Sequence, residues 1–170
     1  LGICVSDLER ATGFYKEVLG AEELTLYKLD EVMPANYRDW MGIPADLACE
    51  SKFLAIDGFL LELLYYTRNG KSAGNPGPSE RRAMHQPGFT HLSLRIADVG
   101  QFKDTLAKVD RFGGHHIENG YLLAEYFEGE PVELSFVTDP DGTRIELMRI
   151  PRNYPMGGTV YHPRSIEHSK

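Results

Sequence analysis

Two glutamates stand at the same position after an Asp-Gly pair, in stretches that are otherwise apolar. Glu62 follows the pair at 57–58 and Glu146 follows the pair at 141–142, each four residues after the glycine. An Asp-Gly pair accepts the positive φ of a tight turn, so each motif predicts a turn that opens a strand. A carboxylate is costly to bury inside an apolar strand unless it is neutralised or paired. A divalent cation can partner several carboxylates at once.

Side chains alternate along a strand, so each glutamate lies on the face opposite the apolar residues that would pack on a helix. His91 lies on the polar face of another expected strand, together with Ser93 and Arg95. If the polar faces meet, Glu62, His91 and Glu146 converge. Such donors suit Zn, Ni, Mn, Co or Fe. The residues equally allow Glu62 to pair with an arginine, Glu146 to be solvated and His91 only to pack.

The chain consists of two similar halves. The segment 1–8 is similar to 92–99, a shift of 91 residues, and the two Asp-Gly motifs are shifted by 84, which is 141 − 57. Two landmarks in the same order indicate a duplicated unit, with extra loop in the first half. In this register the counterpart of His91 is the residue before Leu1, which the sequence does not contain. We expect the natural chain to begin further upstream.

Apolar periodicity and turn residues predict a strand, a helix and three strands in each half. The expected first-half elements are strands at 1–5, 22–30, 50–56 and 59–67 and a helix capped by Ser6 or Asp7 that ends at Leu19. The expected second-half elements are strands at 90–96, 111–118, 132–138 and 143–148 and a helix from Asp98 to about Val109. Long loops are expected at 31–49, with at most one helical turn, and at 119–131, where 122–127 could be a strand instead.

These elements define an α+β fold of two βαβββ modules. We assign residues 1–68 to the first module and 89–150 to the second. The segment 69–88 is rich in Gly, Pro and Ser, which is typical of a linker, and 151–170 is expected to be an extended tail.

Composition argues against several classes of partner. The formal net charge is −7 over 170 residues, with no block of like charges, so we expect neither nucleic acid nor an anionic membrane as a partner. No apolar run approaches the roughly 20 residues that a membrane helix needs. The chain contains only Cys4 and Cys49, which predicts no disulfide framework and a reducing, cytoplasmic location.

Four stretches together carry a resemblance to a known family. They are Leu1–Leu8, Phe14-Tyr15, His91–Leu94 and the motif Asp-Pro-Asp-Gly-x-x-Ile-Glu-Leu that ends at Leu147. Over about residues 1–150 the chain resembles the vicinal oxygen chelate superfamily, which includes glyoxalase I, methylmalonyl-CoA epimerase, extradiol dioxygenases and the fosfomycin and bleomycin resistance proteins. The resemblance implies paired βαβββ modules that form an open, cup-shaped mixed β-barrel around one divalent metal ion. The ligands it implies are the residue before Leu1, then Glu62, His91 and Glu146.

This ligand set bears on the reaction. A set with two glutamates resembles the glyoxalase and epimerase members, in which the metal polarises a carbonyl and stabilises an enediolate while a glutamate moves the proton. We therefore predict a homodimeric, metal-dependent lyase or isomerase acting on a small carbonyl or thioester substrate, with Glu62 or Glu146 as the catalytic base. The alternatives are an Fe(II) extradiol ring-cleavage dioxygenase, which uses two histidines and one carboxylate, and a non-catalytic binder of the bleomycin-resistance kind.

Three further residues are candidates for the pocket wall. Arg95 shares the polar face of His91, where it could hold an anionic substrate group or neutralise a glutamate. His116 follows His115 on an expected strand, and alternation sends one of the two into the cup. Trp40 belongs to the long first-half loop and could line the pocket or a subunit contact.

Overall fold

The structure is a computed structural model of the 170-residue chain, and it describes residues 1–56, 58–73 and 83–155. Asp57 of the first Asp-Gly motif lies outside the described residues, as do 74–82 of the expected linker and 156–170 of the expected tail.

The first module forms one mixed sheet covered by a helix. Its main elements are β1 (Gly2–Val5), α1 (Leu8–Leu19), β2 (Glu22–Lys28), β3 (Ala48–Ile56) and β4 (Phe59–Arg68). The strand order is β1-β4-β3-β2, with β1 parallel to β4 and the other pairs antiparallel. A short strand, β5 (Lys71–Ser72), pairs with β4 inside the segment that we expected to be linker.

The connection between β2 and β3 is more ordered than expected. It contains two short helices, α2 (Leu29–Val32) and α3 (Tyr37–Met41), where we expected a loop with at most one helical turn. The strand expected at 22–30 therefore ends at Lys28.

The second module repeats the arrangement. Its elements are β6 (Leu92–Ile96), α4 (Val99–Lys108), the 3₁₀ helix η2 (Asp110–Phe112), β7 (His115–Phe127), β8 (Glu130–Thr138) and β9 (Arg144–Arg149), with strand order β6-β9-β8-β7. The loop expected at 119–131 is wrong, and so is the end of the preceding strand at 118. β7 runs on to Phe127 because irregular pairing with β8 absorbs the turn-like residues near Gly120. The alternative strand at 122–127 is correct.

Strand pairing confirms the internal repeat and its register. Gly2 pairs with Glu62 in the first sheet, and Ser93 pairs with Glu146 in the second. The shifts between these partners are 91 (93 − 2) and 84 (146 − 62), the two values found in the sequence. The fold is thus α+β with two βαβββ modules.

Capping side chains fix where the two main helices begin, as the sequence predicts. The Asp7 carboxylate accepts a hydrogen bond of 2.9 Å from the Arg10 N–H, and Asp98 accepts one of 2.7 Å from the Gln101 N–H. Helix α1 ends at Gly20, whose φ of 71° is left-handed.

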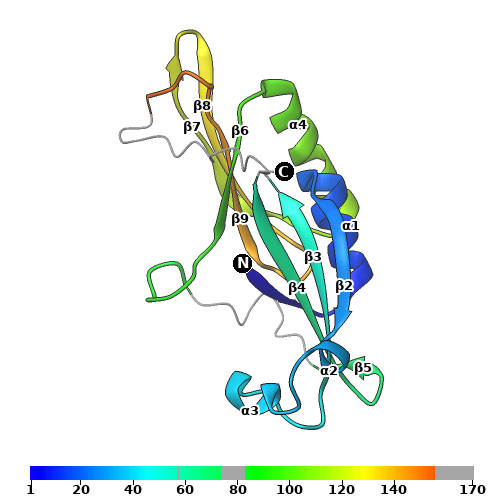
Figure 1. The fold of residues 1–170 in the computed structure, drawn as a ribbon. Helices are drawn as coiled ribbons and strands as arrows, with labels where there is room; N and C mark the ends of the chain where they lie inside the picture. The colour runs from blue at the N-terminus through cyan, green and yellow to red at the C-terminus, as the bar shows by residue number, and fades with distance from the viewer. Residues whose placement is uncertain (57, 74–82, 156–170) are drawn as a thin grey trace.

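The two modules share one hydrophobic core. It unites Leu61 and Leu63 of β4 with Ile145 and Leu147 of β9, all fully buried, and includes Phe14 of α1. Figure 1 shows α1 and α4 beside each other, and residues of the two helices are in contact. Because side chains alternate, Glu62 and Glu146 lie on the faces of the sheets that do not pack in this core.

The turn between β8 and β9 ties the second module to the first. Asp139 is fully buried and accepts a hydrogen bond of 2.9 Å from the Tyr15 hydroxyl of α1. Asp141 accepts one of 3.1 Å from the Ser6 N–H and pairs with Arg10 at 3.0 Å. Both aspartates of the Asp-Pro-Asp-Gly motif at 139–142 therefore hold the modules together.

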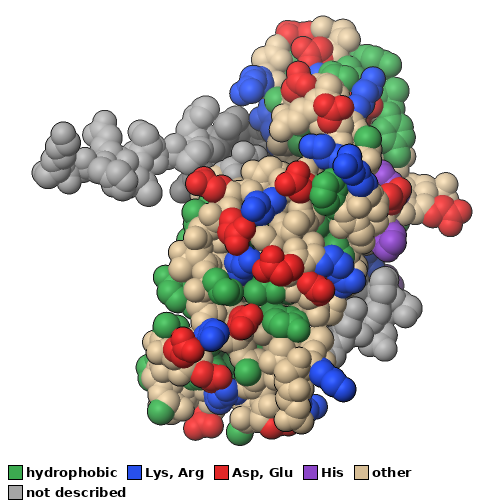
Figure 2. Space-filling view, turned by 90° about the vertical axis from the view of Figure 1, so that its right-hand side faces the viewer, with side chains coloured by type: hydrophobic (Ala, Val, Ile, Leu, Met, Phe, Trp, Pro, Cys, Tyr) green, Lys and Arg blue, Asp and Glu red, His purple; other side chains and the backbone are tan. Residues whose placement is uncertain are grey.

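The longest described helix, α1, has 12 residues, and none of the helices in the described part of the chain could cross a membrane. Acidic and basic side chains are interspersed on the face that Figure 2 shows, so no field of one sign covers it.

Candidate metal centre

His91 and Glu146 lie side by side on the open face of the second sheet. Glu146 stands in the middle of β9, and His91 immediately precedes β6, the strand parallel to β9. The His91 Nε2 is 3.3 Å from Oε2 of Glu146, and the side chains are 23% and 16% exposed. Both groups are thus close enough to bind one ion and accessible to it.

Neighbouring side chains orient both groups. The Ser93 hydroxyl donates a hydrogen bond of 2.6 Å to Oε2 of Glu146. The other imidazole nitrogen of His91, Nδ1, lies 2.9 Å from the Thr90 hydroxyl oxygen, and its ring meets that of Phe136 edge to face at 5.4 Å. Outer partners of this kind fix a metal-binding histidine and carboxylate in place, so this pair fits a divalent metal.

Glu62 has a similar environment in the first sheet. The Ser51 hydroxyl donates a hydrogen bond of 2.6 Å to its Oε1. Phe53 pairs with Glu62 across the strands, as Phe136 pairs with Glu146. Ser93 was expected on the polar face with His91, but no role was predicted for it, for Ser51 or for the two phenylalanines. A sequence signal for the two phenylalanines was present, because each precedes its glutamate by a similar interval. Phe53 lies nine residues before Glu62, and Phe136 lies ten before Glu146.

The three expected ligands do not gather within one chain. His91 and Glu146 are together, but Glu62 lies in the other sheet, and the described ranges hold no group of three His, Cys, Asp or Glu side chains that could bind a metal ion. The reason is the shared core, which packs the apolar faces of both modules around α1 and α4 and leaves the glutamate faces outside it.

Two thiols share the open face of the first sheet with Glu62, and neither is a reactive thiolate. Desolvation, and then the carboxylate of Glu62, raise the pKa of Cys4. Burial raises the pKa of Cys49 to about 11. Both cysteines are free thiols, and both stay protonated at neutral pH.

A cavity of about 270 Å³ opens beside Glu62. Besides the glutamate, the described side chains that line it are apolar and come from β2, α2 and the residue after it, α3 and β3: Tyr27, Leu29, Val32, Met33, Met41 and Phe53. No sequence pattern indicated this cavity, because three of its lining residues, Val32, Met33 and Met41, come from the connection that we expected to be a loop.

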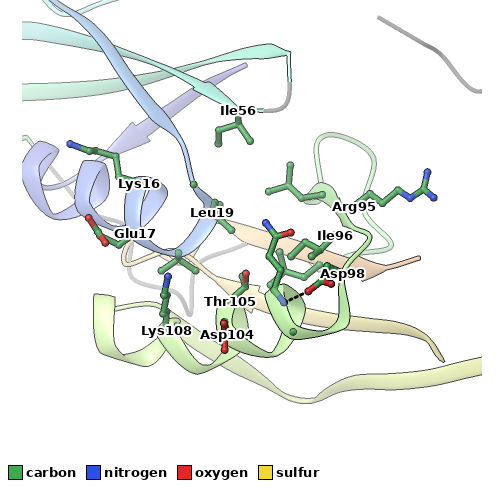
Figure 3. Close-up of a pocket in the computed structure, with 16 residues that line it drawn as sticks. Lys16, Glu17, Leu19, Ile56, Arg95, Ile96, Asp98, Asp104, Thr105 and Lys108 are labelled. Carbon is green, nitrogen blue, oxygen red and sulfur yellow. Dashed lines mark hydrogen bonds between the residues drawn. The ribbon is translucent and has the colours of Figure 1, made fainter. Parts of the chain in front are cut away.

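The other expected pocket residues lie elsewhere. Arg95 lines a cavity of about 600 Å³ between α1, α4 and β6, shown in Figure 3, and its Nε donates a hydrogen bond of 3.1 Å to the Ile150 carbonyl. Nε2 of His116 lies 3.1 Å from the Leu106 carbonyl oxygen at the end of α4. Trp40 is 61% exposed on α3 and is not part of the wall beside Glu62.

Fold and sequence together define the family. Residues 1–147 match the family model of the Glyoxalase/Bleomycin resistance protein/Dioxygenase superfamily, and the chain belongs to this superfamily. No curated protein matches the chain.

Solved structures of the family share the fold at low sequence identity. A glyoxalase family protein from Bacillus cereus is 13% identical, with a TM-score of 0.65 over 88% of this chain and 90% of that one. The fosfomycin resistance protein FosX from Listeria monocytogenes is 14% identical, with a TM-score of 0.51 over 95% and 90%. A V278E mutant of glyoxalase I from Zea mays is 20% identical, with a TM-score of 0.52 over 88% of this chain and 43% of the maize chain.

Proposed function

We propose that this chain is one subunit of a homodimeric, metal-dependent enzyme of the lyase or isomerase kind, acting on a small carbonyl or thioester substrate. The observation that carries the proposal is the equivalence of Glu62 and Glu146. Each carboxylate stands on the open face of its sheet and accepts a hydrogen bond of 2.6 Å from a serine hydroxyl. Together with His91 they make a donor set that suits Zn, Ni, Mn, Co or Fe.

Two copies of the chain would complete this donor set. His91 and Glu146 would come from one subunit, and Glu62 of the partner subunit would face them. A symmetric dimer would then contain two identical sites, because each subunit contributes to both. Exposed apolar side chains on the outer strands β2 and β7 support a buried contact there: Leu24, Leu26, Tyr121, Leu122, Leu123 and Tyr126.

The two glutamates would then have different tasks. A bound divalent cation would polarise the carbonyl of the substrate and make the neighbouring C–H more acidic. A carboxylate must take that proton and return it to the adjacent atom. We assign this role to Glu62, because the cavity beside it can hold part of a substrate. Glu146, fixed between His91 and Ser93, would serve only as a ligand, whereas Glu62 would be both a ligand and the base.

Metal binding is the first test. Chelator-treated protein is dialysed against Zn, Ni, Co, Mn or Fe(II) and analysed by mass spectrometry, with about one ion expected per subunit. Glu62→Gln and Glu146→Gln should each bind at least about tenfold more weakly. Glu118→Gln, at an exposed glutamate of β7, should bind like the natural chain. A natural chain that binds none of these ions contradicts the proposal.

Proton transfer is the second test. In D₂O, the metal-loaded protein should introduce deuterium next to the carbonyl of hydroxyketone or acyl thioester probes, and NMR follows this exchange. The Glu62→Gln variant should not catalyse the exchange. Cleavage of catechol to a yellow product with Fe(II), and no exchange, would favour the dioxygenase class instead.

A non-catalytic binding protein is the second candidate, because no three metal-binding side chains gather within the described part of one chain. It predicts that small apolar compounds stabilise the protein equally with and without chelator.

A further inference from the structure

The cavity beside Glu62 also carries an inference about what is bound. We propose that it binds an uncharged apolar group of the substrate, an aryl ring or a branched alkyl chain, next to the group that reacts at Glu62. This rests on the proposed function only for the position of the reacting group.

The size and lining of the cavity define the group that fits. Its volume is about 270 Å³, whereas a dry cavity of roughly 150 Å³ already binds benzene. Of the seven described side chains that line it, six are apolar and the seventh is Glu62. A carboxylate or phosphate on the substrate would find no cation among the described residues of this wall and would be repelled by Glu62, so an uncharged group is selected.

The wall is apolar and also exposed, which is costly without a ligand. Val32 is 54% exposed, and Met41 and Tyr27 are each 42% exposed. The rings of Tyr27 and Phe53 meet edge to face at 5.9 Å and form an aromatic corner. The thioether of Met41 adapts readily to a flat or branched group and contacts aromatic rings favourably. A bound apolar group would remove this surface from water.

The wall is preformed by its own interactions. Tyr37 is buried, and its hydroxyl donates a hydrogen bond of 2.6 Å to Asp30. Arg38 also pairs with Asp30 and donates to the Leu47 carbonyl. Burial raises the pKa of Tyr37 to about 12, so the hydroxyl remains a donor at all physiological pH values. A rigid wall binds its ligand without the entropic cost of ordering a loop.

Within residues 83–155, the second module has no counterpart to this wall. In the first module α2 and α3 lie between β2 and β3, whereas the corresponding strands β7 and β8 are joined by the tight turn of Glu128 and Gly129. The repeat is thus broken at the point where the cavity forms, which is consistent with a role in recognition and not in the common fold.

A filled cavity tests the inference. Val32→Trp places a large ring in the cavity from a half-exposed position, and Ala45→Trp adds the same ring at an exposed position outside the lining. Two probes, benzohydroxamate and acetohydroxamate, chelate a metal through the same two oxygens and are used with the Zn-loaded protein. A third probe, 4-methylphenol, is used with the metal-free protein. Affinities are measured by calorimetry or ligand-observed NMR.

The natural chain and Ala45→Trp should bind benzohydroxamate at least about tenfold more tightly than acetohydroxamate, because only the former buries a phenyl ring. Val32→Trp should lose this preference and still bind acetohydroxamate. Equal affinities in the natural chain, or a preference that survives in Val32→Trp, would overturn the inference.

The 4-methylphenol measurement separates this inference from the proposed metal site. Even if the protein binds no metal, binding of 4-methylphenol to the natural chain, together with its loss in Val32→Trp, would still support the apolar subsite. Metal binding without any phenyl preference and without 4-methylphenol binding would refute the subsite and leave the proposed function intact.

Discussion

Glu62 and Glu146 occupy equivalent places in the two sheets, but their serine partners come from different strands. Ser93 of β6 binds Glu146, and the residue that corresponds to Ser93 in the first module is Gly2. Glu62 instead receives its hydrogen bond from Ser51 of β3. A hydroxyl thus orients each carboxylate by a different route, which indicates that the orientation itself matters.

The serines should therefore affect metal affinity without being ligands. Ser93→Ala removes the hydrogen bond to Glu146 and should lower metal affinity roughly 10–100-fold, with Ser51→Ala acting similarly on Glu62. Ser93→Thr keeps the hydroxyl and should retain most of the affinity. Dialysis against Zn measures all three variants, and unchanged binding by both alanine variants would show that the hydroxyls do not prepare a metal site.

A site shared between subunits should be restored by mixing two inactive variants. Homodimers of Glu62→Gln or of Glu146→Gln have two damaged sites each. A mixed dimer has one site with both substitutions and one intact site. Unfolding and refolding an equal mixture should therefore restore about a quarter of the metal capacity, since about half of the dimers are mixed. Neither variant refolded alone should recover, and no recovery in the mixture would place all ligands in one chain.

The modules and their register could be predicted from the sequence because the signals are local. Asp7, Gly20 and Asp98 act within one helical turn of their own position, and strand alternation fixes the side of Glu62. The continuation of β7 could not be predicted in the same way, because Asn119-Gly120 is typical of a turn and only pairing with β8 extends the strand. For α3, the left-handed Gly42 at its end was a usable signal.

The arrangement of the ligands was harder to predict. Each module's pattern shows which face carries the glutamate, but not how the modules pack against each other. That packing depends on α1 and α4 and on side chains distant in sequence, such as Phe14 and Phe102. The pair His91 and Glu146 could be predicted because both belong to one module. Whether Glu62 joins them depends on how whole modules associate.

Asp139 should make stability depend on pH with a recognisable sign. Burial raises its pKa above the ordinary 3.8, against the opposing hydrogen bonds from Thr143 and Tyr15. A raised folded pKa means that its contribution is fully present below pH 3.8 and is lost as the pH rises through the folded pKa. Urea denaturation at a series of pH values measures the unfolding free energy of the natural chain and of Asp139→Asn. The difference, natural chain minus variant, should fall as the pH rises above 3.8.

Asp104→Asn provides the control for this titration, since Asp104 is exposed on α4. The difference in unfolding free energy between the natural chain and this control variant should change little over the same pH range. A difference for Asp139→Asn that grows with pH would show that the surrounding donors outweigh the cost of burying the charge.

The contact between modules also makes one glycine indispensable. A Cβ at Gly114 would lie 2.5 Å from Cε2 of Phe14 in α1 and would also collide with the Thr138 carbonyl, a backbone group that cannot turn aside. Gly114→Ala should therefore lower the unfolding free energy by ~3 kcal/mol, as overpacking of a tight interior does.

Gly13→Ala is the matched control, because Gly13 lies inside α1 and a Cβ there meets nothing within 4 Å. It should raise the unfolding free energy by ~0.5–1 kcal/mol through better helix propensity. Urea denaturation of the two variants decides the matter: equal effects would mean that Phe14 does not pack on the second module as described.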